Sequence, residues 1–500
     1  MKMVSCYVPA GGKKMKLSQM FENAPAIEIS GLASDSRQVN KGDMYFCLEG
    51  LVHDGHAYIE QAIAQGAKCI VHSKEITQMS DGIAYIKVHD VNATLNIIAS
   101  KFYGYPSRAM KIFGVTGTNG KSSVASIIED TYSHFAPCGY IGTIAIRYGN
   151  TSLPPSLTTP DPICIHRTMK QMVDAGMKAC ALEVSSHGLE LGRVQSVDFD
   201  IAIFTNLTYD HLDFHGTFEN YFEAKKKLFT NLKPEGIAVL NADDAYFTRL
   251  KEAIQVRYVT YGVQHDATYR ADDIHIGTSG SSFMLYHEGK RYPVETNLVA
   301  LYNIYNLLAA IAGICESGIP LEDILPYVSK LHQIEGRMER IDEGQPFVVI
   351  VDFAHTPDGL TKVFEYAESI TEQGRSIISV FGSAGKRDTK KRKVFGEIAS
   401  KYCDNIILTE DDPRDEDARQ IANEIKSGIH DTNNIFIESR YDAIRQAIES
   451  ANVGDTILIL GKGDEVFMYR EFGREPWLGD HIAARHCIRK YYLGIEDEEK

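Results

Sequence analysis

The chain has 500 residues, which at about 150 residues per domain predicts roughly three domains and excludes a single small binding module. Hydrophobic residues make up 44% and charged residues 24%, as in ordinary globular proteins, which excludes disorder, collagen and coiled coil. The 52 basic and 67 acidic residues leave a net charge of −15. This acidic balance argues against a general nucleic-acid binder, which needs a basic surface, but it allows a local basic site for an anionic substrate.

The nine cysteines are scattered from Cys6 to Cys487 without a C-x-x-C pair, so neither a disulfide framework nor a thiolate zinc site is predicted. The lysines near the N-terminus are not followed by an apolar stretch of signal-peptide length. The longest apolar stretch, residues 298–315, contains Asn303 and Asn306, which would be costly in a bilayer. We therefore expect a cytoplasmic protein without membrane insertion, whose acidic end at residues 496–500 is a solvated tail.

Residues 1–105 mix short β-like pieces with helices. Strands are expected at 43–48 and 68–72, and helices at 58–65 and 91–102. The pair Tyr105-Pro106 is the expected linker to the next domain, because a proline disfavours helix at the residue before it.

From about residue 110 onward, apolar runs alternate with helical patterns, which predicts parallel sheets covered by helices. The expected strands are 111–115, 179–184, 200–205, 237–240, 347–352, 376–381, 405–408 and 455–460. A helical pattern at 302–317 and a polar stretch around Gly336 separate two α/β units. The overall prediction is an α/β protein with three domains, residues 1–105, 106–334 and 335–500.

A phosphate-binding loop is predicted where the strand 111–115 runs into T-G-T-N-G-K-S-S, residues 116–123, ahead of a helical pattern at 124–132. This order directs backbone N–H groups and a helix N-terminus at an anion. Lys121 would reach the terminal phosphates and Ser122 would hold Mg²⁺. The strict G-x-x-x-x-G-K-S spacing is not met, since Val115 stands at its first glycine. An ordinary glycine turn is the alternative, but the flanking strand and helix favour an ATP site.

Three polar segments follow expected strands or lie just beyond them: residues 182–188, 206–216 and 224–229. Loops at the carboxyl ends of parallel strands are where such sheets place ligands. Glu183 is a hard oxygen donor suited to Mg²⁺, and the acids and histidines of 206–216 could coordinate a second metal ion. Each segment taken alone also has an ordinary structural explanation: the first as a helix cap, the second as a polar loop and the third as the solvated face of a helix.

Together these segments resemble the Mur ligase family. The motifs are G-T-N-G-K-S at 117–122, E-V-S-S-H at 183–187, N-L-T-x-D-H-L-D at 206–213 and D-F-A-H-T-P at 352–357. The match extends from Asp35-Ser36-Arg37 to Gly461-Lys462-Gly463, so it covers nearly the whole chain. The resemblance implies a UDP-binding N-terminal α/β domain, a central P-loop ATPase domain with a parallel sheet, and a Rossmann-like C-terminal domain that binds an amino acid.

Within this family the chain is most similar to ligases that join a diamino acid to UDP-N-acetylmuramoyl-L-alanyl-D-glutamate. The implied role is peptidoglycan precursor synthesis, and through it cell-wall biogenesis, cell shape and cell division. The implied reaction is ATP-dependent amide formation: the γ-phosphate passes to the D-glutamate side-chain carboxylate, and the incoming amine attacks the resulting acyl phosphate. Such a reaction requires positioning and charge neutralisation rather than a side-chain nucleophile.

The resemblance implies ATP and Mg²⁺ as cofactors and Lys121, His211 and Lys225 as catalytic residues. In this family the lysine at the place of Lys225 is carbamylated by CO₂, which turns a cation into an anionic metal ligand that suits Mg²⁺. Lys226 and Lys227 follow directly, but counting from His215 favours Lys225. The implied metal neighbours are Ser122, Glu183, His211 and carbamylated Lys225.

Matching to the family also assigns contacts to the three substrates. The ATP contacts are Gly117, Thr118, Asn119, Gly120, Lys121, Ser122, Ser123, Asn303, Asn306, Arg337, Asp352 and His355. The contacts to the UDP-muramoyl dipeptide are Ser36, Thr158, Thr159, Ser185 and Arg193. The contacts to the incoming amino acid are Arg387, Asp412, Arg414, Gly461 and Glu465. For Asn303 and Asn306, which share a helix face, an ordinary polar surface is the alternative.

The identity of the added amino acid depends on two departures from the family pattern. Asp412 stands where the diaminopimelate-adding members usually have asparagine, and Asp464 where histidine is common. Arg414 could pair with the distal carboxylate of meso-diaminopimelate, whereas Asp412 would repel it and favour the ammonium of L-lysine or L-ornithine. The two extra acids favour L-lysine, with meso-diaminopimelate as the alternative.

Three other functions fit the sequence less well than this one. Folylpolyglutamate synthase uses similar phosphate chemistry, but the Asp35-Ser36-Arg37 segment and the D-D-P-R segment at 411–414 argue against it. A non-catalytic ATP-binding regulator would be expected to lose Lys225 or His211, and both are present. A nucleic-acid motor conflicts with the acidic charge. We expect a monomer whose partners are small-molecule substrates, without nucleic acid.

Overall fold

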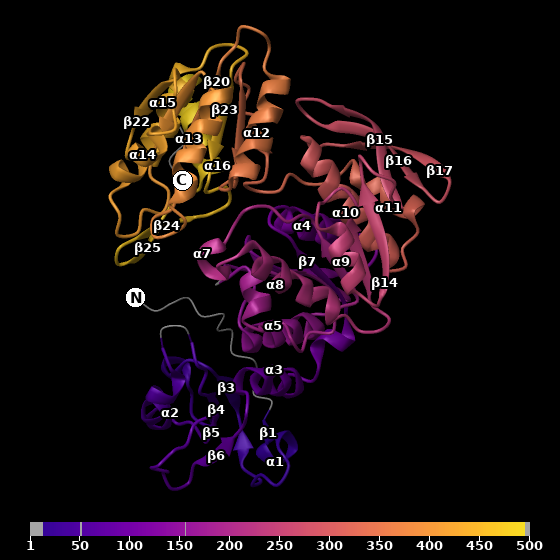
Figure 1. Cartoon of the computed structure of the whole chain (residues 1–500), viewed down its shortest axis with the longest axis vertical. Coiled ribbons are helices and arrows are strands. Elements are labelled where there is room, and N and C mark those ends of the chain that lie inside the picture. Colours follow the sequence, from indigo (N-terminus) through magenta and orange to yellow (C-terminus); the bar gives the residue numbers. More distant parts are fainter. Residues whose placement is uncertain (1–13, 51–52, 156, 496–500) are drawn as a thin grey trace.

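The computed structural model describes residues 14–50, 53–155 and 157–495; Cys6 and the acidic tail at 496–500 lie outside this part. Three bodies follow one another along the chain, each with its own sheet (Figure 1). The sheets lie within the three ranges proposed from the sequence, and the α/β class is confirmed. Within the described ranges, no helix is long and apolar enough to cross a membrane.

The first body is a four-stranded parallel sheet of order β3-β4-β5-β6. Its strands are β3 Gly31–Ala33, β4 Asp43–Phe46, β5 Cys69–His72 and β6 Ala84–Lys87. Its helices are α1 Leu17–Met20, α2 Ile59–Ala64 and α3 Val91–Phe102, and a small antiparallel pair joins β1 Met15–Lys16 to β2 Glu28–Ile29. The carboxylate of Asp90 caps α3 by accepting the N–H of Ala93 at 2.9 Å. Leu95 and Ile98 of α3 join the core formed with Phe46 and Val71.

The central body is an eleven-stranded sheet of order β10-β9-β8-β11-β7-β12-β13-β14-β15-β16-β17. Its strands are β7 Lys111–Thr116, β8 Cys138–Ile141, β9 Ile146–Tyr148, β10 Thr151–Leu153, β11 Ala179–Glu183, β12 Ile201–Phe204, β13 Ile237–Asn241, β14 Arg257–Gly262, β15 Tyr269–Ile276, β16 Ser281–His287 and β17 Lys290–Thr296. Its helices are α4 Lys121–Tyr132, α5 Pro162–Asp174, α6 Ser186–Glu190, α7 Leu212–His215, α8 Phe218–Thr230, α9 Phe247–Ala253, α10 Leu301–Glu316 and α11 Leu321–Val328.

The parallel core of this sheet, from β8 to β14, is buried on both faces, as crossover connections require. Helices α4 and α10 pack on the face that includes Val115 and Ile203. Helices α5 and α8 cover the opposite face, which includes Ile112 and Leu182. The two-sided burial explains why these strands are continuous apolar runs in the sequence.

Both ends of the sheet contain antiparallel strands, and neither end was predicted from the sequence. One end adds β9 and β10; at the other end β15 pairs in parallel with β14, and β16 and β17 follow as antiparallel strands. Along β16, buried and partly exposed residues alternate, so it lacks the continuous apolar run by which the core strands were identified. These edge strands alternate because only one of their faces meets the core.

The third body has a six-stranded sheet of order β18-β19-β23-β20-β21-β22, parallel except for β18. Its strands are β18 Glu339–Arg340, β19 Val348–Asp352, β20 Ile377–Phe381, β21 Asn405–Leu408, β22 Asn433–Phe436 and β23 Thr456–Leu460, with a separate hairpin of β24 Phe467–Arg470 and β25 Gly473–Pro476. Its helices are α12 Pro357–Ile370, α13 Lys390–Tyr402, α14 Ala418–Lys426, α15 Arg440–Ser450 and α16 Asp480–Cys487, followed by a π-helical turn at Ile488–Tyr492.

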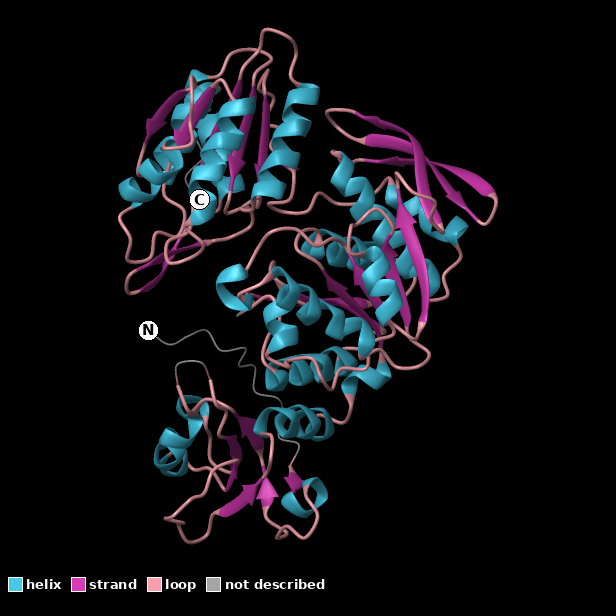
Figure 2. Ribbon diagram, in the orientation of Figure 1, coloured by secondary structure: helices cyan, strands magenta, loops and turns pink. Residues whose placement is uncertain are grey.

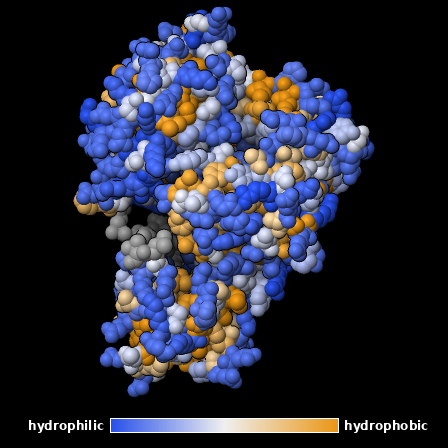
Figure 3. All heavy atoms as spheres, in the orientation of Figure 1, coloured by the Kyte–Doolittle hydropathy of each residue, from blue (hydrophilic) through white to orange (hydrophobic). Residues whose placement is uncertain are grey.

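Figure 2 shows helices on both sides of the third sheet. Helices α12, α13 and α14 contribute to one hydrophobic cluster on this sheet, and α15 and α16 contribute to another. The third body is therefore a doubly covered sheet of the Rossmann-like kind implied by the resemblance. Figure 3 shows one face of the molecule covered mainly by hydrophilic residues, with smaller hydrophobic patches.

A fully buried ion pair joins α15 to α16. The Arg440 guanidinium donates to both carboxylate oxygens of Asp480, at 2.7 and 2.6 Å, and to the carbonyl oxygen of Leu460 at 2.8 Å. Both side chains are 0% exposed. Because neither charge is solvated, each depends on its partner.

We expect Asp480→Ala to destabilise the third domain strongly, since it leaves the Arg440 charge buried and unpaired. Breaking such a pair costs about 3–5 kcal/mol, which lowers the domain's melting temperature by roughly 10 °C. Differential scanning calorimetry measures the shift. Arg445→Ala is the matched control, because the Arg445–Glu449 pair on the surface of α15 is about 40% exposed and should contribute less than about 1 kcal/mol. A shift as small as the control's would contradict a structural role for the pair.

Candidate active site between the central and third domains

One cavity of about 1100 Å³ is lined by residues of both the central and the third domain. The central domain contributes the loops that follow β7, β11 and β12, where a parallel sheet places its ligands. The third domain faces them with loops that follow β19, β20, β21 and β23. Of the residues predicted from the sequence, the cavity wall includes Thr118, Asn119, Gly120, Lys121, Ser122, Ser123, Thr158, Glu183, Ser185, His211, Asn306, Arg337, Asp352, His355, Arg387, Asp412, Arg414, Gly461 and Glu465.

The predicted phosphate loop forms between β7 and α4, and two of its glycines are required by geometry. A Cβ on Gly117 would lie 1.8 Å from the hydroxyl oxygen of Thr205, and one on Gly120 would lie 2.4 Å from the side-chain oxygen of Asn306. Gly120 also has φ +87°, which L side chains rarely adopt. Helix α4 begins at Lys121 directly after this turn, so its first N–H groups and its dipole face the cavity.

Two lysine side chains meet at the carbonyl oxygen of Gly117. Lys225 Nζ donates to it at 2.7 Å, and Lys121 Nζ donates to it at 3.1 Å and to the carbonyl oxygen of Thr118 at 2.9 Å. Burial lowers the pKa of Lys225 well below its usual range, and the neighbouring Lys121 lowers it further. Burial also lowers the pKa of Lys121, while Glu183 and Asp210 oppose that shift.

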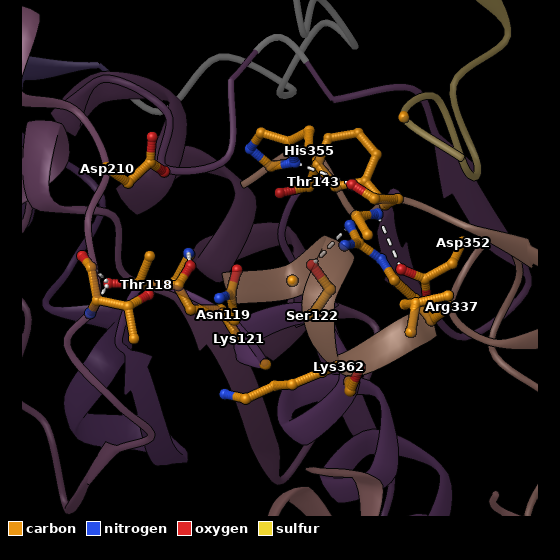
Figure 4. A pocket seen from close by; sticks show the side chains of 18 of the residues that line it. Thr118, Asn119, Lys121, Ser122, Thr143, Asp210, Arg337, Asp352, His355 and Lys362 are labelled. Carbon is orange, nitrogen blue, oxygen red and sulfur yellow. Dashed lines mark hydrogen bonds between the residues drawn. The ribbon is translucent and has the colours of Figure 1, made fainter. Parts of the chain in front are cut away.

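Glu183 ends β11 with its side chain fully buried. Its carboxylate accepts from the Ser122 hydroxyl at 2.9 Å, the Thr143 N–H at 2.8 Å and the Thr143 hydroxyl at 3.3 Å, and also from the Tyr140 hydroxyl. Ser122 and Glu183 thus form an oxygen-rich pair beside the phosphate loop. Figure 4 shows Ser122 and Thr143 on the wall of this part of the cavity.

His211 lies at the start of α7 with φ +53°, and its Nε2 is 3.2 Å from a carboxylate oxygen of Asp210. Burial lowers the pKa of His211 to about 3, so its imidazole is neutral at physiological pH and has a lone pair for a metal ion. Burial also lowers the pKa of His187 to about 4, and its ring centroid is 4.7 Å from that of His211.

These residues fit Mg²⁺ only when substrate oxygens complete the coordination. In the described ranges, no three His, Cys, Asp or Glu side chains form a metal-binding cluster. Mg²⁺ is usually held by one or two carboxylates together with phosphate oxygens and water. Glu183, Ser122 and neutral His211 meet that requirement, whereas the ammonium of unmodified Lys225 would repel a cation.

The third domain brings Arg337 to the phosphate loop. The Arg337 guanidinium donates to the Ser122 hydroxyl at 3.2 Å and lies over the Phe353 ring at 4.3 Å from its centroid. Figure 4 shows Arg337 and Ser122 pointing toward one another. Asp352 accepts the N–H groups of Met338 at 2.7 Å and Ala354 at 2.8 Å, and burial raises its pKa to about 6. Arg337 of the third domain therefore lies beside the phosphate loop of the central domain.

A second bridge between the domains reaches the same loop. The Asn119 side chain donates to the carboxylate of Asp358 on α12 at 3.0 Å, and Lys362 donates to the same oxygen at 2.9 Å. Asn119 is itself fixed by Asn206, whose side chain accepts the Asn119 N–H at 3.0 Å. The phosphate loop is thus linked to the third domain at both Ser122 and Asn119.

The far end of the cavity carries the residues predicted to bind the amino acid. Asp412 accepts from Lys462 Nζ at 2.8 Å and from the Tyr469 N–H at 2.9 Å. Lys462 also donates to Glu465 at 2.7 Å, and burial raises the pKa of Glu465 to about 7. Arg414 lines this end, and its buried Nε has no hydrogen-bond partner within the described structure.

These contacts weaken the electrostatic argument for L-lysine. Asp412 is paired with Lys462, which also pairs with Glu465, and Asp464 lies 3.5 Å from Arg337. Neither extra acid is therefore an unpaired charge at the amino-acid end. The sequence could not reveal this, because the partners are 50 and 127 residues apart.

Six predicted residues do not line the cavity. They are Ser36, Gly117, Thr159, Arg193, Lys225 and Asn303. Lys225 lies beneath the phosphate loop and Asn303 lies behind Asn306, to which its side-chain oxygen is bonded at 3.0 Å. Arg193 donates to the carbonyl oxygen of Thr159 at 2.9 Å. Ser36 is in the first domain, where its hydroxyl bonds to Gln61 at 2.8 Å.

Several residues of the site were not predicted from the sequence. The cavity is also lined by Thr143, Thr208, Tyr302, Tyr305, Lys362 and Lys391, and Asp358 contacts the phosphate loop at Asn119. Asp210, one of the acids of 206–216 proposed as metal ligands, lines the cavity as well. Thr143 follows the end of β8, so its position in the chain could have indicated it. Nothing in the local sequence of α12 distinguishes Lys362 from an ordinary surface lysine.

The fold and the site together define a class: an ATP-dependent ligase with a P-loop domain whose nucleotide site is completed by a Rossmann-like domain. Three family models match the chain. The Mur ligase family catalytic domain matches residues 28–103, the Mur ligase middle domain residues 115–314, and the Mur ligase glutamate ligase domain residues 336–463. The chain belongs to the Mur ligase family.

Its relatives include the UDP-N-acetylmuramoyl-L-alanyl-D-glutamate--2,6-diaminopimelate ligases of Geobacillus kaustophilus and Listeria monocytogenes. The first is 39% identical, over 95% of this chain and 100% of that protein. The second is 37% identical, over 95% of this chain and 99% of that protein. A solved ligase structure with the same description has a TM-score of 0.68 and 29% identity, and the match covers 96% of this chain and 100% of that one. The folylpolyglutamate synthase of Mycobacterium tuberculosis, at 16% identity and a TM-score of 0.64 over 81% of this chain and 96% of that one, shares the fold.

We expect Glu183→Gln to weaken binding of Mn²⁺, used as a Mg²⁺ surrogate with a non-hydrolysable ATP analogue, by at least about tenfold. The amide keeps the size of the side chain but loses the charge that a hard cation requires. Electron paramagnetic resonance of free Mn²⁺ measures the binding.

Glu129→Gln is the matched control. Glu129 is also a largely buried glutamate of the central domain, but it pairs with Arg147 away from the cavity. Equal Mn²⁺ affinity for both variants would exclude Glu183 as a metal ligand.

Proposed function

We propose that the protein adds meso-diaminopimelate to the D-glutamate of UDP-N-acetylmuramoyl-L-alanyl-D-glutamate, with conversion of ATP to ADP and phosphate. The observation that carries this proposal is the single cavity that joins a phosphate loop at one end to Arg387 and Arg414 at the other. A reaction that activates a carboxylate with ATP and then transfers it to an amine needs both ends in one space.

The central-domain residues divide the phosphoryl-transfer step among them. Lys121 and the first N–H groups of α4 bind the terminal phosphates, while Arg337 approaches from the third domain. Mg²⁺ would supply charge neutralisation at Glu183, Ser122 and His211. His355 and Lys391, which line the cavity beside Asp352, help to exclude water from the acyl phosphate.

We propose that Lys225 carries a carbamate. Burial lowers the pKa of Lys225, so its amine has the lone pair that attacks CO₂; the N–C bond forms and one proton is released. The modification places an anion beside Lys121, which suits both Lys121 and Mg²⁺. An ammonium at this position would repel the metal ion.

The choice of meso-diaminopimelate has two supports. Arg414 lines the cavity, and its buried Nε has no hydrogen-bond partner in the described structure; a guanidinium at this place suits the distal carboxylate that L-lysine lacks. The relatives at 37–39% identity are named as 2,6-diaminopimelate ligases. The expectation of L-lysine, which rested on Asp412 and Asp464, is not confirmed: both acids are paired with cations, and the named relatives are diaminopimelate ligases.

A phosphate-release assay with UDP-N-acetylmuramoyl-L-alanyl-D-glutamate should therefore show meso-diaminopimelate as the preferred amine over L-lysine and L-ornithine. Because the distal carboxylate is read by Arg414, Arg414→Met should raise the KM for meso-diaminopimelate by about a hundredfold and leave the weak use of L-lysine nearly unchanged. Mass spectrometry of the product identifies the added residue.

Arg419→Met is the control, since Arg419 lies on α14 over Phe436, outside the cavity. Preferred use of L-lysine by the unmodified protein would overturn the substrate proposal. Failure of every amine to yield ADP and a longer peptide would overturn the ligase proposal itself.

Carbamylation is tested separately, by ¹³C NMR of protein equilibrated with ¹³C-bicarbonate. The unmodified protein should show a carbamate resonance, and Lys225→Ala should lose it together with ligation, with no recovery on added bicarbonate. Lys226→Ala is the control, because Lys226 is the next residue and pairs with Glu223 on the helix surface. A resonance that persists in Lys225→Ala, or full activity in that variant, would exclude the carbamate at this position.

A further inference from the structure

Asp464 is a buried carboxylate that the proposed reaction leaves without a role. It follows β23 in a loop on the cavity wall, and its side chain is 5% exposed. One of its oxygens has no hydrogen-bond partner in the described structure. A buried carboxylate is costly unless a cation lies close to it, so the neighbours of Asp464 indicate what it does.

The cation beside Asp464 is Arg337. Its Nη2 lies 3.5 Å from the carboxylate, and this is the only ion pair of Arg337 among the described residues. The other contacts of the guanidinium are the Ser122 hydroxyl and the Phe353 ring, neither of which carries a charge. Asp352 is also near, but backbone N–H groups occupy both of its oxygens.

The two loops that carry this pair pack closely against each other. A Cβ on Gly336, the residue before Arg337, would lie 2.1 Å from the backbone nitrogen of Asp464. The carbonyl oxygen of Gly336 also accepts the Phe353 N–H at 2.9 Å, which joins its loop to the segment after β19. This close backbone packing places the carboxylate beside the arginine side chain.

We propose that Asp464 is a positioning residue that fixes the Arg337 guanidinium in the orientation in which it meets the phosphates of ATP. The carboxylate lies near Nη2, the same nitrogen that donates to the Ser122 hydroxyl, and Phe353 lies under the face of the guanidinium, so Asp464 acts on the donor that faces the phosphate loop. This inference rests on the proposed function, in which Arg337 contacts ATP. Orientation fixed before the reaction lowers the barrier without a direct contact to substrate.

Asp464→Asn tests the idea, because it keeps the shape of the side chain and removes its charge. We expect the KM for ATP to rise and kcat to fall, each by about tenfold, while the KM values for the dipeptide substrate and the amino acid stay within about twofold. A general structural defect would change all three KM values together. A lower KM for ATP would mean that Asp464 merely repels phosphate, and would overturn the proposal.

A double-mutant cycle with Arg337→Ala separates positioning from other effects of the variant. In the Arg337→Ala background, Asp464→Asn should change kcat/KM for ATP by less than about twofold, since the side chain that it orients is gone. An undiminished effect in that background would overturn the proposal. If the unmodified protein does not ligate at all, the proposed function fails instead, and the two failures are therefore distinguishable.

Two further variants complete the design. Asp342→Asn is the matched control: Asp342 forms a pair with Arg340 at the same 3.5 Å, but it is 58% exposed and outside the cavity, so its kinetics should equal those of the unmodified protein. Asp464→Glu keeps the charge and should recover part of the loss in Asp464→Asn. Equal losses in both Asp464 variants would show a packing role only, and would overturn the proposal even if Asp464→Asn folds poorly.

Discussion

The carbonyl oxygen of Gly117, where two buried lysines converge, sets the electrostatic condition of the whole site. A carbonyl oxygen has two lone pairs and can accept both lysine donors. Positive charge on both lysines is unfavourable, because both are removed from water and Lys121 lowers the pKa of Lys225 further. The loop therefore favours negative charge beside it, which suits phosphate on the cavity side and the carbamate proposed for Lys225 on the buried side.

Acidic side chains of the central domain lie near these lysines without neutralising them. Glu183 and Asp210 lie near the lysines, but Glu183 already accepts hydrogen bonds from Ser122, Thr143 and Tyr140. Its charge is thus held at one place and remains open to a divalent cation. A metal ion held by Glu183 would add positive charge beside the negative charge of a phosphate. This attraction is strong in a cavity of low dielectric constant.

The third domain contributes contacts to the phosphate loop that the central domain does not make by itself. Arg337 and Asp358 touch the phosphate loop at Ser122 and Asn119, so the position of one domain is coupled to the geometry of the nucleotide site in the other. The same domain carries Arg414 at the opposite end of the cavity. One domain therefore carries side chains at both ends of the cavity.

Much of the fold was predictable because its causes are local. The phosphate loop, α3 and the core strands follow from apolar runs, glycines and caps, and they lie where the sequence placed them to within a few residues. The edge strands β15 to β17 were missed since half of their residues face away from the core. The site divides in the same way: Lys121 and Glu183 belong to contiguous motifs, whereas Lys362 acquires its place only when two domains meet.

The acids at positions 412 and 464 show most clearly what could not be predicted from the sequence alone. Asp412 and Asp464 both look like additional negative charge, and the sequence suggests that they repel an anionic substrate. In the fold, each meets a cation from a distant segment, Lys462 or Arg337. A buried charge acts through the pair that it forms, because the field of a closely paired acid and base falls off faster than that of either alone. The effect of each acid on the site therefore depends on the cation with which it is paired.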